Sequence, residues 1–219
     1  MNSSLQKGLA ELVGTFLFVF SIVGALNGAG ALAPLAIGFA LMVFVYAVGH
    51  ISGGHLNPAV SFGAFLRGAI DAKDFGIYVV AQVIGGVLAA LLSMALWPRP
   101  EAGMELDVWP AFLAELVFTF ALVLVVLNTA TSKDHPGNSF YGLAIGTTVF
   151  VGAATVGGIS GGSFNPAVAI GLSVSGQFSW MYIWLYILAP LVGAAIAAGV
   201  FRVTSAADFA AKTNTKTDA

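Results

Sequence analysis

The sequence contains no cysteine, and only 8% of its 219 residues are charged. Without thiols the chain has no disulfides, no thiolate metal site and no cysteine nucleophile. A soluble globular domain carries about 25% charged residues, so this composition is typical of a membrane protein. The ten acidic and eight basic residues nearly balance, and they form no basic patch. We therefore expect no nucleic-acid partner.

Long apolar segments make up most of the chain, which is 58% hydrophobic. A membrane-spanning helix needs about 20 mostly apolar residues. Six segments approach that length, and we expect spans at residues 5–26, 32–50, 75–97, 109–131, 140–157 and 178–203. Residues 1–203 are predicted to form one domain in the lipid bilayer. Residues 204–219 are small and polar, and are predicted to form a flexible cytoplasmic tail.

Basic residues are distributed unevenly between the two sides of these spans. If the N-terminus is cytoplasmic, seven basic residues lie on the cytoplasmic side: Lys7, Arg67, Lys73, Lys133, Arg202, Lys212 and Lys216. Only Arg99 lies outside. Cytoplasmic loops carry the excess of Lys and Arg, so both termini are predicted to be cytoplasmic. We expect a multi-pass protein of the plasma (inner) membrane.

The chain repeats itself. Val48–Gly63 and Val156–Gly171 match at 11 of 16 positions after a shift of 108 residues, and both copies contain Asn-Pro-Ala. A shift of 104 places Glu11 on Glu115. Each half, residues 5–97 and 109–203, holds three spans. Because three is odd, the second half crosses the membrane in the opposite sense, as in an inverted repeat.

The repeated motif follows the second span of each half. Asn57 and Asn165 suit the N-cap of a helix, and Pro58 and Pro166 suit its first turn. We expect re-entrant chains followed by half-helices at residues 58–65 and 166–174, with their N-terminal ends meeting near the midplane. The predicted fold class is an all-α membrane protein with six transmembrane helices and two re-entrant half-helices.

Two Asn-Pro-Ala motifs, paired glutamates and six spans resemble the aquaporin (major intrinsic protein) family over nearly the whole chain. The resemblance implies a passive channel for water and small neutral solutes, with one pore in each chain of a homotetramer. It implies no enzyme activity, catalytic residue, cofactor or metal.

The resemblance places the motif residues in the pore: Asn57, Pro58, Ala59, Asn165, Pro166 and Ala167. We expect the two Asn side chains to point their NH2 groups into the lumen while backbone N–H groups occupy their oxygens. Acceptors on the approaches are expected from the carbonyls of His50, Ser52, Gly53, Gly158, Ser160 and Gly161. The alternative is that each Asn only caps its half-helix.

Glu11 and Glu115 are ionisable groups within spans. Such groups often mark a proton or cation pathway. The alternative is structural support, in which each carboxylate accepts hydrogen bonds from the re-entrant chain of its own half, and symmetry favours this interpretation. His55 is replaced by Ser163 in the second copy, and is interpreted either as loop support or as a pore-facing group.

The family's outer constriction implies four positions counted from the motifs, namely Ile37, Ala153, Gly162 and Val168. Strict water channels typically have an aromatic residue, a His and an Arg there, and this chain has none. Val168 occupies the Arg position, as an apolar residue does in some plant tonoplast aquaporins. A wide, apolar filter predicts passage of ammonia, hydrogen peroxide, urea or glycerol besides water, unless Arg99 substitutes for the missing Arg.

Three other classes are compatible with parts of the sequence. A secondary transporter also uses inverted repeats and broken helices, but needs a coupling-ion site. An intramembrane serine protease would use the short pattern Gly158-Ile159-Ser160-Gly161, which leaves the first motif unexplained. A purely adhesive membrane protein would need more exposed loop surface than this chain offers.

Overall fold

Six membrane-length helices form the body of the described part of the protein. The computed structural model describes residues 3–209. The six candidate spans agree with the predicted ones to within a few residues, the largest difference being an end at Ser93 where residue 97 was expected. The spans are α1 (Ser4–Gly28), α2 (Ala33–Ser52), α4 (Ala72–Ser93), α5 (Val108–Val126), α6 (Tyr141–Ser160) and α8 (Ile183–Thr204).

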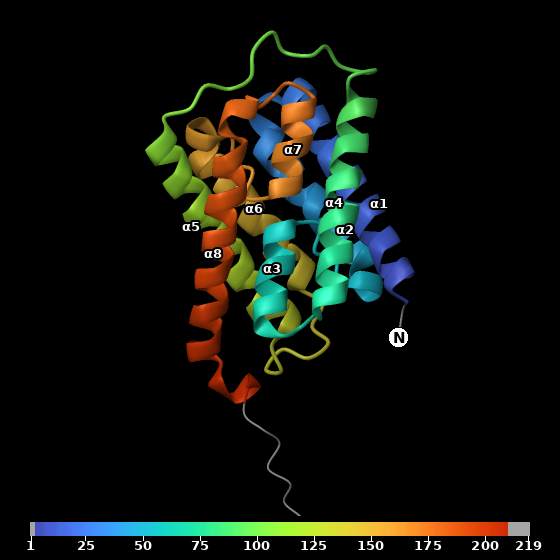
Figure 1. Ribbon diagram of the computed structural model, residues 1–219, viewed down its shortest axis with the longest axis vertical. Helices are drawn as coiled ribbons and strands as arrows, with labels where there is room; N and C mark the ends of the chain where they lie inside the picture. The colour runs from blue at the N-terminus through green and yellow to red at the C-terminus, as the bar shows by residue number, and fades with distance from the viewer. Residues whose placement is uncertain (1–2, 210–219) are drawn as a thin grey trace, which may run out of the picture.

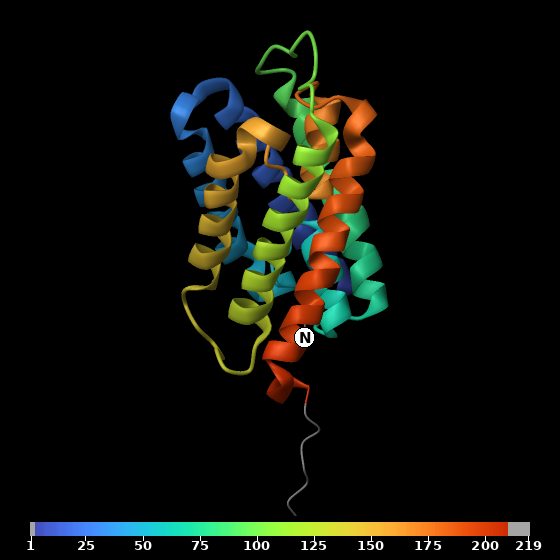
Figure 2. The same cartoon turned by 90° about the vertical axis from the view of Figure 1, so that its left-hand side faces the viewer.

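Short turns extend three of these spans. Gly30–Leu32 and Trp180–Tyr182 form 3-10 turns before α2 and α8, and Leu127–Thr131 continues α5 as a π-helical turn. Six spans return the chain to the side on which it started, and we call this side the terminal face. Figure 2 shows the connection 132–140 at the terminal face and the longer connection 94–107 at the opposite face.

Two shorter helices lie inside the bundle. They are α3 (Pro58–Arg67) and α7 (Pro166–Val174), and in Figure 1 α7 stands above α3 within the ring of spans. At 1.5 Å per residue each is about 15 Å long, or half of the 30 Å hydrocarbon core. Each therefore crosses half of the membrane, as predicted.

The packing follows the inverted repeat. Helix α1 packs on α4 and α2, and α5 packs correspondingly on α8 and α6. Each half-helix contacts the third span of the other repeat, α3 with α8 and α7 with α4. The two halves join along α2 and α6, where a Cβ on Gly38 would lie 2.7 Å from the carbonyl oxygen of Gly146. Only glycine permits this approach, which brings the halves together at the centre.

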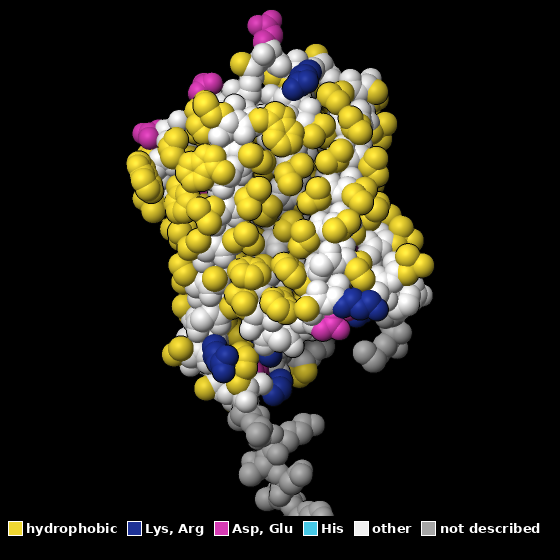
Figure 3. Space-filling view, viewed as in Figure 1, with side chains coloured by type: hydrophobic (Ala, Val, Ile, Leu, Met, Phe, Trp, Pro, Cys, Tyr) yellow, Lys and Arg dark blue, Asp and Glu magenta, His cyan; other side chains and the backbone are white. Residues whose placement is uncertain are grey.

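The surface matches a bilayer. Figure 3 shows hydrophobic side chains covering the middle of one face, with Lys, Arg, Asp and Glu near the two ends. The outward-facing residues of the spans include exposed Leu5, Val80, Leu113 and Leu188. An apolar belt of this kind is stable only against lipid, so the protein is an integral membrane protein.

The predicted flexible tail is wrong for its first residues. Helix α8 continues to Thr204, and Ala206–Asp208 forms a 3-10 turn in which Asp208 is buried. The reason is a set of polar contacts between Asp208 and residues far away in the sequence, described below. The remainder of the predicted tail, residues 210–219, lies outside the described residues.

Candidate functional site

The two half-helices begin at capping asparagines. The side-chain oxygen of Asn57 accepts a hydrogen bond from the N–H of Ala59 at 2.8 Å, and that of Asn165 accepts from Ala167 at 2.9 Å. Pro58 and Pro166 occupy the first helical positions, where a missing N–H breaks no hydrogen bond. The predicted caps are confirmed, and each Asn oxygen is occupied by backbone donors as expected.

The side-chain nitrogens connect the two halves. Asn57 Nδ2 donates to the carbonyl of Phe164 at 2.8 Å, and Asn165 Nδ2 donates to the carbonyl of Leu56 at 2.8 Å. An amide NH2 has two hydrogens. One hydrogen of each NH2 group is therefore used between the two halves, and the prediction that these groups point into a lumen applies to the second hydrogen.

The residues that receive these bonds have an unusual backbone. Leu56 and Phe164 have φ of 50° and 49°, in the left-handed region that large side chains rarely adopt. Such a conformation costs on the order of 1–3 kcal/mol and persists only when the surroundings enforce it. Here the N–H of each residue is held by a carboxylate and its C=O by the opposite asparagine.

Glu11 and Glu115 are those carboxylates, and neither is exposed to solvent. Glu11 accepts from the N–H groups of His55 at 2.9 Å and Leu56 at 2.7 Å. Glu115 accepts from Ser163 at 2.9 Å and Phe164 at 2.6 Å. Both also accept from a serine hydroxyl at the end of the preceding span, Ser52 and Ser160 respectively. The geometry is that of loop support, the structural interpretation favoured by symmetry.

His55 belongs to a network found in the first half alone. Its Nδ1 lies 3.0 Å from the hydroxyl of Ser61, which also accepts from Gln82 Nε2 at 3.0 Å. Gln82 Nε2 donates in addition to Glu11 at 2.7 Å. In the second half, a shift of 108 replaces these positions by Ser163, Ala169 and Pro190. His55 is thus held by its neighbours and also faces the cavities described next, which combines both of its predicted roles.

Two neighbouring cavities lie between the terminal face and the asparagines. The narrow cavity has a volume of about 20 Å³, room for about one water molecule. Asn57 and Asn165 both line it. The larger cavity, which we call the vestibule, measures about 440 Å³ and opens at the terminal face. Gly53, His55 and Val126 line both cavities, so the two cavities are adjacent at these residues.

The predicted row of carbonyl acceptors is only partly correct. Helices α2 and α6 extend further than expected, so His50, Gly158 and the two serines belong to their last turns. The carbonyl of Ser52 accepts from Tyr78 at 2.6 Å, and that of Ser160 from Tyr186 at 2.5 Å. These two carbonyls therefore serve buried tyrosines. Non-helical backbone starts only at Gly53 and Gly161, both of which have left-handed φ.

The four predicted filter positions lie on the opposite side of the asparagines from the vestibule. A Cβ on Gly162 would lie 3.2 Å from Ala153 Cα, so these two residues are in contact. Ile37 and Val168 are 9% and 2% exposed within the apolar core. Arg99 packs instead on Gly176, beyond the far end of α7 and about 12 Å of helix from Val168. This position does not favour Arg99 as a substitute for the missing filter Arg.

The narrow cavity is also lined by residues that were not predicted from the sequence. Gly54, Val60 and Ile145 line it. After the 108-residue shift they correspond to Gly162, Val168 and Ile37, the predicted filter positions. The structure thus places an inner constriction at the mirror position of the predicted outer one. Applying the repeat to the filter residues would have identified these positions.

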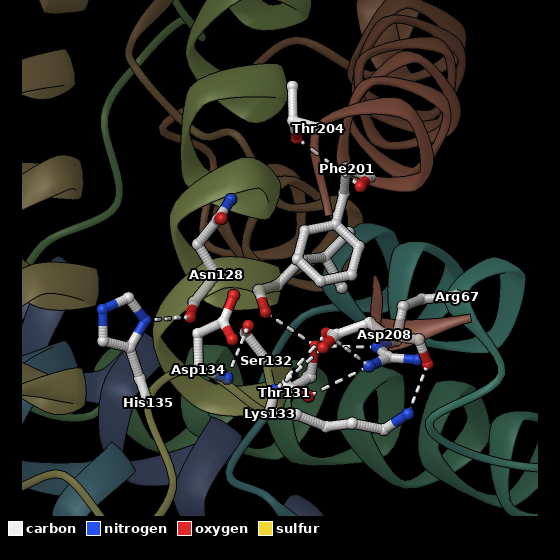
Figure 4. A network of polar contacts seen from close by, with 11 residues as sticks. Arg67, Asn128, Thr131, Ser132, Lys133, Asp134, His135, Phe201, Thr204 and Asp208 are labelled. Carbon is white, nitrogen blue, oxygen red and sulfur yellow. Dashed lines mark hydrogen bonds and ion pairs between the residues drawn. The ribbon is translucent and has the colours of Figure 1, made fainter. Parts of the chain in front are cut away.

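A polar network borders the vestibule at the terminal face (Figure 4). Arg67 donates to Asp208 at 2.9 Å, and to the hydroxyl and carbonyl of Thr131 at 3.0 and 3.1 Å. Asp208 also accepts from the N–H of Lys133 at 3.1 Å. Thr131 and Ser132 line the vestibule. The network therefore connects the end of the described chain to the wall of the vestibule.

A family model described as Major intrinsic protein matches residues 1–201. The chain belongs to the major intrinsic protein family. The match covers both Asn-Pro-Ala motifs and nearly all of the six spans. The family assignment agrees with the inverted repeat seen in the packing.

Relatives within the major intrinsic protein family cover most of the chain. It is 38% identical over 227 residues to "Glycerol uptake facilitator protein-like 6" of Lactiplantibacillus plantarum, covering 93% of this chain and 100% of the relative. It is 37% identical over 218 residues to a "Probable aquaporin TIP-type" of Medicago truncatula, covering 91% of this chain and 87% of the relative. The X-ray structure of the aquaglyceroporin from Plasmodium falciparum has the same fold, with a TM-score of 0.79 and 23% sequence identity. The match covers 95% of this chain and 100% of that structure.

Proposed function

We propose that the protein is a passive channel for water and small uncharged solutes, with one pore in each chain. The observation that carries this proposal is the position of Asn57 and Asn165. They cap two half-helices that meet head to head, and both line a cavity that shares Gly53, His55 and Val126 with the open vestibule. Irregular backbone at this depth is tolerated where it is buried in protein or lines a water-filled passage.

The half-helices supply the selectivity against ions. Each N-terminus carries roughly +0.5 of an elementary charge, and the two positive ends face one another. The second N–H of each asparagine amide offers a donor, so a passing water accepts there and turns its hydrogens outward. The orientation interrupts a proton relay, and the positive field repels cations.

The apolar filter sets the range of solutes. Ile37, Ala153, Gly162 and Val168 provide neither the fixed charge nor the fork of donors that an arginine supplies. Selection by size is weaker at such a constriction. Ammonia, hydrogen peroxide, urea and glycerol are therefore proposed as solutes besides water. The names of the relatives, a glycerol uptake facilitator and aquaporins, support this range.

The hydrogen bonds of the two buried glutamates do not favour a coupled transporter. Glu11 and Glu115 are engaged by hydrogen-bond donors of their own re-entrant chains, which leaves them in structural positions. Ser160, the serine of the protease-like pattern, donates to Glu115 just as Ser52 donates to Glu11. The duplicated structural role accounts for that pattern without a nucleophile.

We further propose that both termini are cytoplasmic, that the host membrane is the plasma (inner) membrane and that the assembly is a homotetramer. The seven-to-one distribution of basic residues supports the orientation. The family resemblance supports the tetramer. Protease protection of an epitope placed at either terminus in sealed vesicles would test the orientation, and native mass spectrometry would test the subunit number.

Stopped-flow light scattering on proteoliposomes tests the channel and its filter together. Wild-type protein should pass water, urea and glycerol without saturation or an ion gradient. Val168→Arg should keep water permeability but lower glycerol permeability by ~tenfold, because it adds a charge and bulk at the constriction. Val168→Ile is the matched apolar control. Unchanged glycerol permeability in Val168→Arg would refute the wide filter, and ion-coupled or saturating flux would refute the channel.

A further inference from the structure

A long apolar groove runs along the lipid-facing surface between α1 and α4. Its volume is about 860 Å³. Gly8 and Gly76 lie in it, and Lys73 lies at its end near the terminal face. Its apolar walls are formed by Leu5, Leu9, Leu12, Ile77, Val80 and Ile84. We call this feature the α1–α4 groove, and its position gives it no part in the proposed pore.

The inverted repeat shows what is unusual about the groove. The 104-residue shift that relates Glu11 to Glu115 relates Gly8 to Phe112. The 108-residue shift that relates Tyr78 to Tyr186 relates Gly76 to Trp184.

At the equivalent place between α5 and α8, the rings of Phe112 and Trp184 stack with their centroids 6.4 Å apart. The second half therefore fills this position with its own side chains. In the first half, a Cβ on Gly76 would meet nothing within 4 Å. In a membrane the open space is filled by an apolar molecule.

The length of the groove fits an acyl chain of one leaflet. Along α4 its residues run from Ala72 to Ile84, a rise of about 18 Å at 1.5 Å per residue. One leaflet contributes about half of the 30 Å hydrocarbon core. The groove thus extends from the interface at the terminal face to the middle of the bilayer.

The interfacial end of the groove carries one exposed ammonium group. Lys7 is paired with Asp74 at 2.5 Å, and the Asp74 carboxylate also accepts from Ser4 at 3.1 Å. Asp71 caps α4 by accepting from the N–H of Asp74 at 2.7 Å. Lys73 is exposed and lines the groove. Its flexible stem lets the ammonium reach the level of lipid phosphates.

We propose that the α1–α4 groove binds an acyl chain of a phospholipid whose phosphate lies at Lys73. To test this, the full chain is reconstituted in vesicles of dioleoyl-phosphatidylcholine, dioleoyl-phosphatidylglycerol and dioleoylglycerol. It is then extracted in mild detergent, and retained lipid is counted by native mass spectrometry. Wild type should retain an additional phospholipid per chain relative to Gly76→Trp, which fills the groove. Gly199→Trp, an equally open glycine on the exposed side of α8, is the matched control and should retain it.

The headgroup contact has its own variant. Lys73→Gln should weaken phospholipid retention ~fivefold, the effect expected for loss of a basic residue near anionic phosphates, and leave dioleoylglycerol retention unchanged. Retention of dioleoylglycerol equal to that of the phospholipids in the wild type would refute the phosphate contact.

Two further outcomes would overturn the proposal. The first is unchanged lipid retention in Gly76→Trp with a smaller oligomer, because the groove would then be a contact between copies of this chain. The second outcome concerns a replacement experiment, which is used if Gly76→Trp does not fold. The double variant Met181→Lys/Trp184→Gly then transfers the open position and its cation to the second half, and a failure to gain a phospholipid would contradict the proposal.

Discussion

The side-chain amide of Asn57 donates a 2.8 Å hydrogen bond to the backbone carbonyl of Phe164, which lies in the re-entrant chain of the opposite repeat. Asn165 returns the same bond to Leu56. Each asparagine thus caps its own half-helix with its oxygen and binds the other half with its nitrogen. No continuous backbone connects the half-helices at the midplane, so these two hydrogen bonds link the two halves there.

Replacing Asn57 by Asp separates the two roles of the side chain. The carboxylate still caps α3, since Asp is a good N-cap residue. It cannot donate to Phe164, and it places a negative charge between two positive helix ends. We expect a loss of about 1–3 kcal/mol in stability and a higher sodium leak in proteoliposomes, measured with an ion-sensitive dye. Asn27→Asp, at the end of α1, is the control, and an unchanged leak would contradict the midplane barrier.

Removing one charge from the loop supports should destabilise the re-entrant chains. Glu11→Gln and Glu115→Gln each turn a buried acceptor of at least three hydrogen bonds into a group with one acceptor oxygen. We expect a loss of about 3 kcal/mol in each case, because hydrogen bonds to charged groups contribute about 1.5–3 kcal/mol. Thermal unfolding in detergent measures the loss. Glu101→Gln, in an exposed connection, should have no effect, and equal stabilities would reject the supporting role.

The Asn-Pro-Ala motifs made the half-helices predictable because capping is local chemistry. An asparagine followed by a proline predicts the first residue of a helix, and both α3 and α7 begin at the proline of their motif. The backbone of Leu56 and Phe164 was not predictable in the same way. A left-handed conformation is normally associated with Gly or Asn, whereas here it is imposed by glutamates more than 40 residues away in the sequence.

The predicted flexible tail failed for a related reason. Composition after Val203 is small and polar, which is typical of a disordered end. The ordering group is Asp208, whose partner Arg67 is 141 residues distant. Arg67 Cζ also lies 5.2 Å from the ring centre of Phe201 and 5.1 Å from that of Phe209. Contacts at such separations depend on the finished fold, so a local pattern cannot indicate them.

The inner constriction yields a prediction about permeation. Ile145 lines a cavity with room for about one water, so added bulk should close it. We expect Ile145→Trp to lower water permeability by at least ~tenfold in stopped-flow measurements, since no second water can bypass the ring. Ile159→Trp is the matched control, because Ile159 lies on the same helix, is 44% exposed and does not line the narrow cavity. Water permeability equal to wild type in Ile145→Trp would place the pore elsewhere.

Loss of the Asp208 carboxylate should loosen the vestibule wall. In Asp208→Asn, Arg67 loses its charged partner, and breaking a largely buried pair costs about 3–5 kcal/mol. Hydrogen exchange should accelerate at the amides of residues 133–138, apart from Pro136, which has no N–H, and at those of the last turn of α8. Asp134→Asn changes an exposed carboxylate on the same connection and serves as the control. Unaltered exchange at Lys133, whose N–H donates to Asp208, would contradict this account.

The absence of cysteine predicts how the protein responds to mercury. With no thiol in the sequence, mercuric chloride has no high-affinity target, so water permeability should stay unchanged by the reagent. Val149→Cys introduces a thiol into the lining of the narrow cavity, where a bound mercury ion would occupy the space of the single water. This variant should lose most of its water permeability on treatment and regain it with a reducing thiol. A cysteine at the lipid-facing Val151 should react without blocking flow. Block of the cysteine-free protein would show that mercury acts on a group other than a thiol. Resistance of Val149→Cys would show that the narrow cavity is not the route of water.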